Sequence, residues 1–75
     1  MMITWEGLRG RSAYAVYEID VDPVATSQAQ ATRYRVWADQ RLIGTFAESE
    51  DMAREIARRW DAFQEAVSPY IPKWR

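Results

Sequence analysis

Arg33, Arg35 and Trp37 alternate along one short segment of the chain, and these residue types are suited to molecular recognition. Residues two apart in a β-strand point to the same face, so the three side chains are expected on one side of a sheet. Tryptophan and arginine are enriched at the energetic centres of protein interfaces, and arginines on a sheet also contact phosphates and base edges of DNA. The alternation predicts a strand over residues 32–38 with one exposed recognition face.

A second segment is expected to lie beside this strand. Residues 13–21 are dense in β-branched and aromatic residues and contain no strand breaker, which predicts another strand. If the two strands pair, the exposed face carries the residues expected to bind a partner, namely Tyr14, Val16, Glu18, Arg33, Arg35 and Trp37. A second interpretation stays open, in which Glu18 forms cross-strand ion pairs with the arginines while Trp37 covers the sheet.

Residues typical of catalytic and metal sites are scarce. The 75 residues include no histidine and no cysteine, so the commonest general base, the commonest metal ligand and thiolate chemistry are all missing. Asp20 and Asp22 lie at the end of a predicted strand, directly before Pro23, a pattern more typical of a solvated turn than of a catalytic carboxylate pair or a cation site. We therefore expect a protein that is not an enzyme and that has no metal and no cofactor.

The charge is nearly balanced. Ten basic and eleven acidic residues give a net charge of −1, which argues against a general polyanion binder and leaves a locally basic face possible. No apolar run approaches the roughly 18 residues of a membrane span, and the first residues lack the apolar core of a signal peptide. We expect a cytoplasmic protein that does not contact membranes.

An amphipathic helix over residues 49–67 is expected to cover the other face of the sheet. Its apolar residues recur at spacings of three and four and fall on one helical stripe: Met52, Ala53, Ile56, Ala57, Trp60, Phe63 and Val67. Ser49 is a suitable N-cap, and Pro69 ends the helix. Ion pairs with a spacing of four residues are predicted from Glu50 to Arg54 and from Glu55 to Arg59. Arg58 and Arg59 are assigned to the solvated flank, with Glu55 and Asp61 close enough to neutralise them.

These segments predict one small α+β domain over residues 1–75. Its three-stranded antiparallel sheet, formed by residues 13–21, 32–38 and 41–46, precedes the helix in the order β-β-β-α. Residues 1–12 are a lead-in, residues 24–30 a loop and residues 69–75 a tail. The predicted core is Tyr17, Ile19, Tyr34, Val36, Leu42 and Phe46 against Met52, Ile56, Trp60 and Phe63. A homodimer is possible through an edge strand or through the tail.

Two short patterns extend beyond the recognition face. Gly7, Arg9 and Arg11 form a glycine- and arginine-rich opening, and the residues Gly-Thr-Phe at 44–46 precede a helix that contains Ala53 and Ala57. On these residues the chain resembles the AP2-type DNA-binding domains and the related arm-binding modules of phage integrases. The resemblance implies a three-stranded sheet on one helix, with the arginine-rich face in the DNA major groove. The implied nucleic-acid contacts are Arg9, Arg11, Arg33, Arg35 and Trp37.

In size and style the chain is also similar to small proteins of phages and other mobile elements, including anti-CRISPR proteins, that inhibit host complexes by occupying a surface. We therefore expect, first, a non-enzymatic protein-binding module that acts through the exposed sheet face. The alternative is an AP2-like DNA-binding domain that reads DNA with its sheet.

Overall fold

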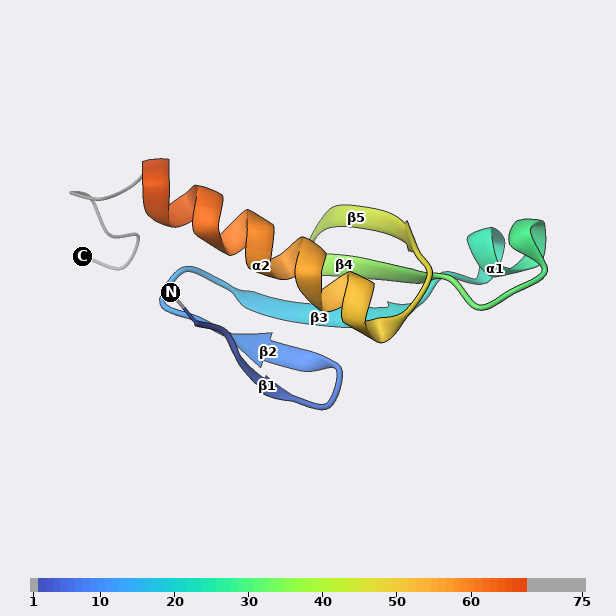
Figure 1. The fold of residues 1–75 in the computed structure, drawn as a ribbon, viewed down its shortest axis with the longest axis horizontal. Helices are drawn as coiled ribbons and strands as arrows, with labels where there is room; N and C mark the ends of the chain where they lie inside the picture. Colours follow the sequence, from blue (N-terminus) through green and yellow to red (C-terminus); the bar gives the residue numbers. More distant parts are fainter. Residues whose placement is uncertain (1, 68–75) are drawn as a thin grey trace.

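Five antiparallel strands form one sheet in the computed structural model, which describes residues 2–67 (Figure 1). The strands are β1 (Thr4–Glu6), β2 (Arg9–Arg11), β3 (Val16–Val21), β4 (Tyr34–Ala38) and β5 (Arg41–Ala47). Each strand pairs with the next one along the chain, in the order β1-β2-β3-β4-β5. Helix α1 (Pro23–Ala29) lies in the connection from β3 to β4, and helix α2 (Glu50–Val67) follows β5 and packs across β3, β4 and β5.

The α+β class, the antiparallel sheet and the amphipathic helix after it are confirmed, but the sheet has five described strands where three were predicted. Within the expected lead-in of residues 1–12, β1 and β2 form a hairpin around Gly7, whose φ of 63° suits glycine. Trp5 lies opposite Gly10, and a Cβ on that glycine would come within 2.7 Å of the indole ring. The absence of a side chain at position 10 therefore lets Trp5 pack down onto the sheet. The predicted tail of residues 69–75 lies outside the described residues.

The loop predicted over residues 24–30 is largely helix α1. The Asp22 carboxylate caps this helix by accepting hydrogen bonds from the backbone N–H groups of Val24 and Ala25, each at 3.1 Å. Pro23 is suited to the first turn, where its missing N–H has no helical partner to lose. The Asp-Pro pair that we interpreted as a turn after the strand is thus the start of a helix.

Helix α2 agrees closely with its prediction. The Ser49 hydroxyl accepts a hydrogen bond from the backbone N–H of Met52 at 3.1 Å, as expected of an N-cap. The predicted ion pairs are present, with N–O distances of 3.5 Å from Arg54 to Glu50 and 3.0 Å from Arg59 to Glu55.

The core lies between α2 and one face of the sheet and is built largely from small residues. Its buried side chains are Ala15, Tyr17, Ile19, Val36, Ala38, Ala47, Ala53 and Ala57, with Ile3, Trp5, Leu8, Tyr34, Ile43, Ile56 and Trp60 packed around them. The small side chains of Ala53 and Ala57, both fully buried, allow the helix backbone to approach the sheet closely. The predicted core positions that this confirms are Tyr17, Ile19, Tyr34, Val36, Ile56 and Trp60.

The prediction was wrong for Leu42, Phe46, Met52 and Phe63, each of which is about half exposed. The register of β5 against β4 shifts twice, and Phe46 has a φ of 62°, so the alternation assumed for this strand is broken. Leu42 lies before the first shift. Only Asp39 and Gln40 separate β4 from β5, so Leu42 pairs with Trp37 on the face away from the helix. The C-terminal part of α2 runs past the end of β4 and β5 (Figure 1), and Phe63 is 60% exposed on this helix.

Asp61 is also corrected, because it is buried at 1% exposure instead of lying on the solvated flank of α2. Its Oδ1 accepts a hydrogen bond from the Tyr17 hydroxyl at 2.5 Å and another from the Ser12 hydroxyl. The Tyr17 ring lies between Trp5 and Trp60, with ring centroids 6.4 Å and 6.1 Å away. One buried carboxylate therefore joins α2 to β3 and to the turn before it.

We predict that Tyr17→Phe lowers the free energy of unfolding by about 1–3 kcal/mol, because it removes one donor from a buried carboxylate and keeps the ring. Urea denaturation followed by tryptophan fluorescence measures the change. Tyr34→Phe is the matched control, since the structure gives the Tyr34 hydroxyl no hydrogen bond to any residue within 2–67. Equal, small effects of the two substitutions would contradict the role given to the Tyr17–Asp61 hydrogen bond.

A second prediction concerns alkaline pH. Burial, and then the hydrogen bond to the Asp61 carboxylate, raise the pKa of the Tyr17 hydroxyl far above its ordinary value. Above about pH 10 the unfolded chain loses this proton while the folded protein keeps it. The stabilisation is therefore complete below pH 10 and is lost as the pH rises toward the folded-state pKa. Urea unfolding at several values between pH 9 and 11 should show a steeper loss of stability in the unsubstituted protein than in Tyr17→Phe, and parallel curves would refute this.

Candidate functional site

One face of the sheet is covered by α2, and no other element within residues 2–67 covers the opposite face, here called the outer face (Figure 1). The strand register places one residue from each strand in a row across it. Glu6 pairs with Arg9, Arg9 with Glu18, Glu18 with Trp37, and Trp37 with Leu42. We call these five residues the outer row; it runs from an ionic end on β1–β3 to an apolar end on β4 and β5.

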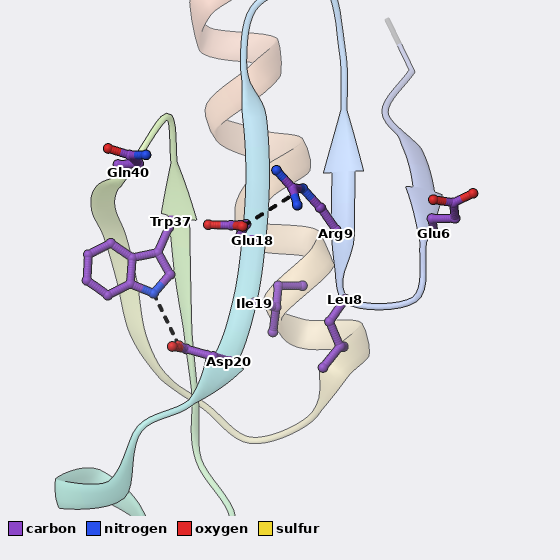
Figure 2. A pocket seen from close by; sticks show the side chains of 8 residues that line it. All are labelled: Glu6, Leu8, Arg9, Glu18, Ile19, Asp20, Trp37 and Gln40. Carbon is purple, nitrogen blue, oxygen red and sulfur yellow. Dashed lines mark hydrogen bonds and ion pairs between the residues drawn. The ribbon is translucent and has the colours of Figure 1, made fainter.

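A hollow of about 520 Å³ opens beside the outer row, as Figure 2 shows. Its lining residues are Glu6, Leu8, Arg9, Glu18, Ile19, Asp20, Trp37 and Gln40. Carboxylates outnumber guanidinium groups in this lining, and Leu8 and Trp37 supply its apolar surface, since the Ile19 side chain is buried in the core. The hollow thus combines apolar walls with negatively charged groups.

Asp20, Arg35 and Trp37 form an internally satisfied cluster at one side of the hollow. Arg35 donates from Nε and Nη2 to the two carboxylate oxygens of Asp20, at 2.7 Å and 3.1 Å. The Trp37 indole N–H donates to Asp20 Oδ1 at 3.1 Å, and the Arg35 guanidinium lies 5.3 Å from the centroid of the indole ring. The hydrogen bonds from Arg35 hold the pKa of the Asp20 carboxyl below its usual range.

The other carboxylates of the hollow are less well paired. Glu18 Oε2 lies 3.8 Å from Arg9 Nε, and these side chains are 49% and 70% exposed, so the ion pair is long and solvated. Figure 2 shows Arg9 reaching toward Glu18, with Glu6 on the far side of the hollow. The structure gives Glu6 no ion pair with any residue in the range 2–67.

The structure brings together four of the six residues predicted for partner binding: Val16, Glu18, Arg35 and Trp37 share the outer face. Tyr14 lies elsewhere because β3 begins at Val16 and not at residue 13. Its backbone N–H donates to the Ser12 hydroxyl at 3.0 Å in the turn between β2 and β3. The same short turn that positions Ser12 beside Asp61 therefore removes Tyr14 from the predicted surface.

Arg33 does not belong to the sheet face either, since it precedes β4. Its backbone N–H donates to the Thr26 hydroxyl at 3.0 Å, and its guanidinium donates to the Thr32 carbonyl at 3.1 Å. Arg33 thus connects β4 to α1. A cross-strand ion pair is present on this face, as one interpretation expected. It joins Arg35 to Asp20, whereas the expected pair joined Glu18 to Arg33 or Arg35.

The arginines implied by the AP2 resemblance differ in how accessible they are on the outer face. Arg9 and Arg11 both project from β2 on the outer face, where Arg11 lies between Thr4 and Val16. Arg35 is engaged by Asp20.

Sequence reasoning missed Glu6, Leu8, Asp20 and Leu42 as surface neighbours of Trp37. The signal that identifies the first two is the pair Gly7-Leu8, a two-residue connection with glycine first, which is typical of a tight β-hairpin. The signal for Leu42 is the two-residue turn at Asp39 and Gln40, which pairs residue 42 with Trp37 and so places both on the same face.

Within the part of the chain that the structure describes, no group of three acidic side chains is arranged to hold a metal ion. No helix among residues 2–67 is long and apolar enough to cross a membrane.

Asp20 is predicted to titrate below the ordinary aspartate range, which lies near pH 4. The Trp37 indole N–H reports this carboxyl directly, because it donates to Asp20 Oδ1. An NMR pH titration of that indole signal should give a midpoint below the ordinary range, and Arg35→Gln should shift the midpoint upward. A depressed folded-state pKa stabilises the fold above the ordinary pKa, and this contribution is lost as the pH falls through the folded-state value. A midpoint near pH 4 in the unsubstituted protein would contradict the cluster.

Comparison of the chain with protein-family models, with curated proteins and with solved structures gives no match.

Proposed function

We propose that the protein is a non-enzymatic binding module that holds a protein partner on the outer face. The observation that carries this proposal is the outer row, which crosses all five strands and is not covered by either helix. At its centre Trp37 is partly buried beside the half-exposed Leu42, and charged groups flank them. An aromatic and aliphatic centre with a polar rim is the usual anatomy of a protein interface.

The charges of the outer face favour a protein over DNA. Three carboxylates, those of Glu6, Glu18 and Asp20, stand on or beside the surface that would approach phosphates. Arg35 is already held by two hydrogen bonds to Asp20, which leaves the arginines of β2 as the remaining cations of the face. Phosphate contacts supply much of the affinity of DNA-binding proteins, so nearby carboxylates oppose such binding.

DNA binding remains the second candidate because Arg9 and Arg11 point from one strand to the same exposed face, at positions that the AP2 resemblance implies. Under this alternative the two guanidinium groups contact phosphate or guanine. The salt dependence of DNA binding separates the two candidates. A protein that neutralises phosphates releases their counterions, so its affinity for DNA falls steeply as the salt concentration rises.

The face, and not an edge of the sheet, is proposed as the docking surface. Edge strand β5 is broken by two register shifts and by the positive φ of Phe46, and such bulges discourage pairing with a further strand. The opposite edge, β1, spans only three residues. A homodimer through an edge is therefore less favoured than a different protein on the face.

In its narrower form the proposal is that the protein inhibits a larger complex by occupying one of its surfaces, in the manner of the small inhibitors of phages and mobile elements, anti-CRISPR proteins among them. Its support is the small size of the domain and the presence of one uncovered face on a sheet whose other face is packed against a helix.

Leu42→Ser should abolish capture of the partner while Phe63→Ser leaves it intact. Leu42 is 47% exposed on the outer face, whereas Phe63 is 60% exposed on α2, so both substitutions remove a solvated apolar side chain and spare the fold. Tagged variants and the unsubstituted protein are compared by affinity capture and mass spectrometry, with urea unfolding as the check on folding. Proteins retained equally by both variants would place binding away from the outer face and overturn the proposal.

Titration with short mixed-sequence DNA duplexes at low and moderate salt, followed by tryptophan fluorescence, tests the alternative. The proposal expects no binding that weakens steeply with salt. Steep weakening, together with a loss of binding in Arg11→Ala, would replace protein binding by DNA binding.

A further inference from the structure

The hollow beside the outer row has an excess of negative charge that the protein does not itself neutralise. The charge of Asp20 is matched by Arg35 at 2.7 Å. Glu6 and Glu18 remain, and within residues 2–67 they share a single cation, Arg9, which lies 3.8 Å from Glu18. One carboxylate charge is therefore left for an outside group.

The apolar lining of the hollow indicates which kind of outside group could neutralise this charge. Leu8 and the Trp37 ring line it, and these surfaces suit a long aliphatic stem that carries a charge at its end. Lysine and arginine have this form. The Trp37 ring already packs against one guanidinium, that of Arg35, which illustrates how an indole in this setting accommodates a planar cation.

We propose that the hollow receives an arginine or lysine side chain of the protein partner, with its charged end at Glu18 and Glu6. This inference rests on the proposed function and specifies which partner the outer face accepts. In the free protein Arg9 lies beside Glu18, in the place that the partner's cation would take. Arg9 is 70% exposed and makes one long contact with Glu18, so it is readily displaced.

This arrangement predicts the direction in which two substitutions change the affinity for a cationic segment. Removing Arg9 frees Glu18 and leaves the hollow more negative, so Arg9→Ala should tighten binding of a cationic segment. Glu18→Gln keeps the shape and removes the charge, so it should weaken that binding. A partner held through phosphate or carboxylate groups requires the opposite sign for both variants, because it depends on Arg9 and is repelled by Glu18.

The test uses a short blocked peptide in which arginine alternates with threonine, and a matched peptide in which neutral citrulline replaces each arginine. Each is titrated into ¹⁵N-labelled protein while backbone amide and indole signals are followed by NMR. The arginine peptide should shift the signals of Leu8, Arg9, Glu18 and the Trp37 indole, and the citrulline peptide should not. Glu18→Gln should weaken binding about tenfold, and Arg9→Ala should tighten it about two- to fivefold.

Three results of the peptide titration would overturn the inference. They are shifts confined to other acidic surfaces such as the start of α2, equal binding of the citrulline peptide, and an affinity that Glu18→Gln leaves unchanged. If the partner identified by capture is lost in Leu42→Ser but is held more weakly by Arg9→Ala, the outer face binds a protein through anionic groups. The cationic inference then fails while the proposed function stands. If capture is unaffected by Leu42→Ser, the proposed function fails, whatever the peptides do.

Discussion

The buried carboxylate of Asp61 is the constraint on which the arrangement of this protein depends. A carboxylate that is 1% exposed requires hydrogen-bond donors, and Tyr17 and Ser12 donate to its Oδ1 from β3 and from the turn before it. Its Oδ2 is buried without a partner among residues 2–67, so the two bonds at Oδ1 are what offsets the burial of the charge. Since both donors come from the sheet side, these bonds hold α2 against one face, and no element within residues 2–67 covers the outer face.

Helix α2 also holds the hairpin that completes the candidate site. Arg54 donates to the Gly7 carbonyl at 3.0 Å, and its guanidinium lies 5.6 Å from the centroid of the Trp5 ring. Trp5 in turn packs over Gly10 and against Tyr17. The β1–β2 hairpin, whose three-residue strands bury little apolar area, is thereby fixed beside β3. Without this attachment Glu6 and Leu8 would not line the hollow, so the helix determines the shape of a surface that it does not touch.

Features that repeat over many residues were predictable from the sequence, and features that depend on single contacts were not. The periodicity of residues 49–67 and the alternation around Trp37 identified α2, β4 and the outer position of Trp37. Strands β1 and β2 have three residues each, which is too few for an alternating pattern to be recognised. Leu42 was misplaced because the two-residue turn before β5 pairs it with Trp37 on the outer face, and the prediction placed it in the core. Asp61 was misplaced because a charged residue on a helix is expected in solvent unless distant donors contact it. Tyr14 and Arg33 lie outside the strands predicted for them, because β3 and β4 begin later than their composition suggested.

The sheet face carries both tightly paired and loosely paired charged side chains, and they lie in different parts of it. Asp20 and Arg35 form the cross-strand ion pair, and the Trp37 indole N–H is bound to the same carboxylate. A side chain held in this way has little rotational freedom left to lose when a partner covers it, which lowers the entropic cost of association. The paired cluster therefore fixes the Trp37 side chain, while the loosely paired Arg9 and Glu18 beside it keep their charges accessible. A rigid indole and accessible charges thus lie next to each other on a face that no element within residues 2–67 covers, and the proposed binding role rests on this combination.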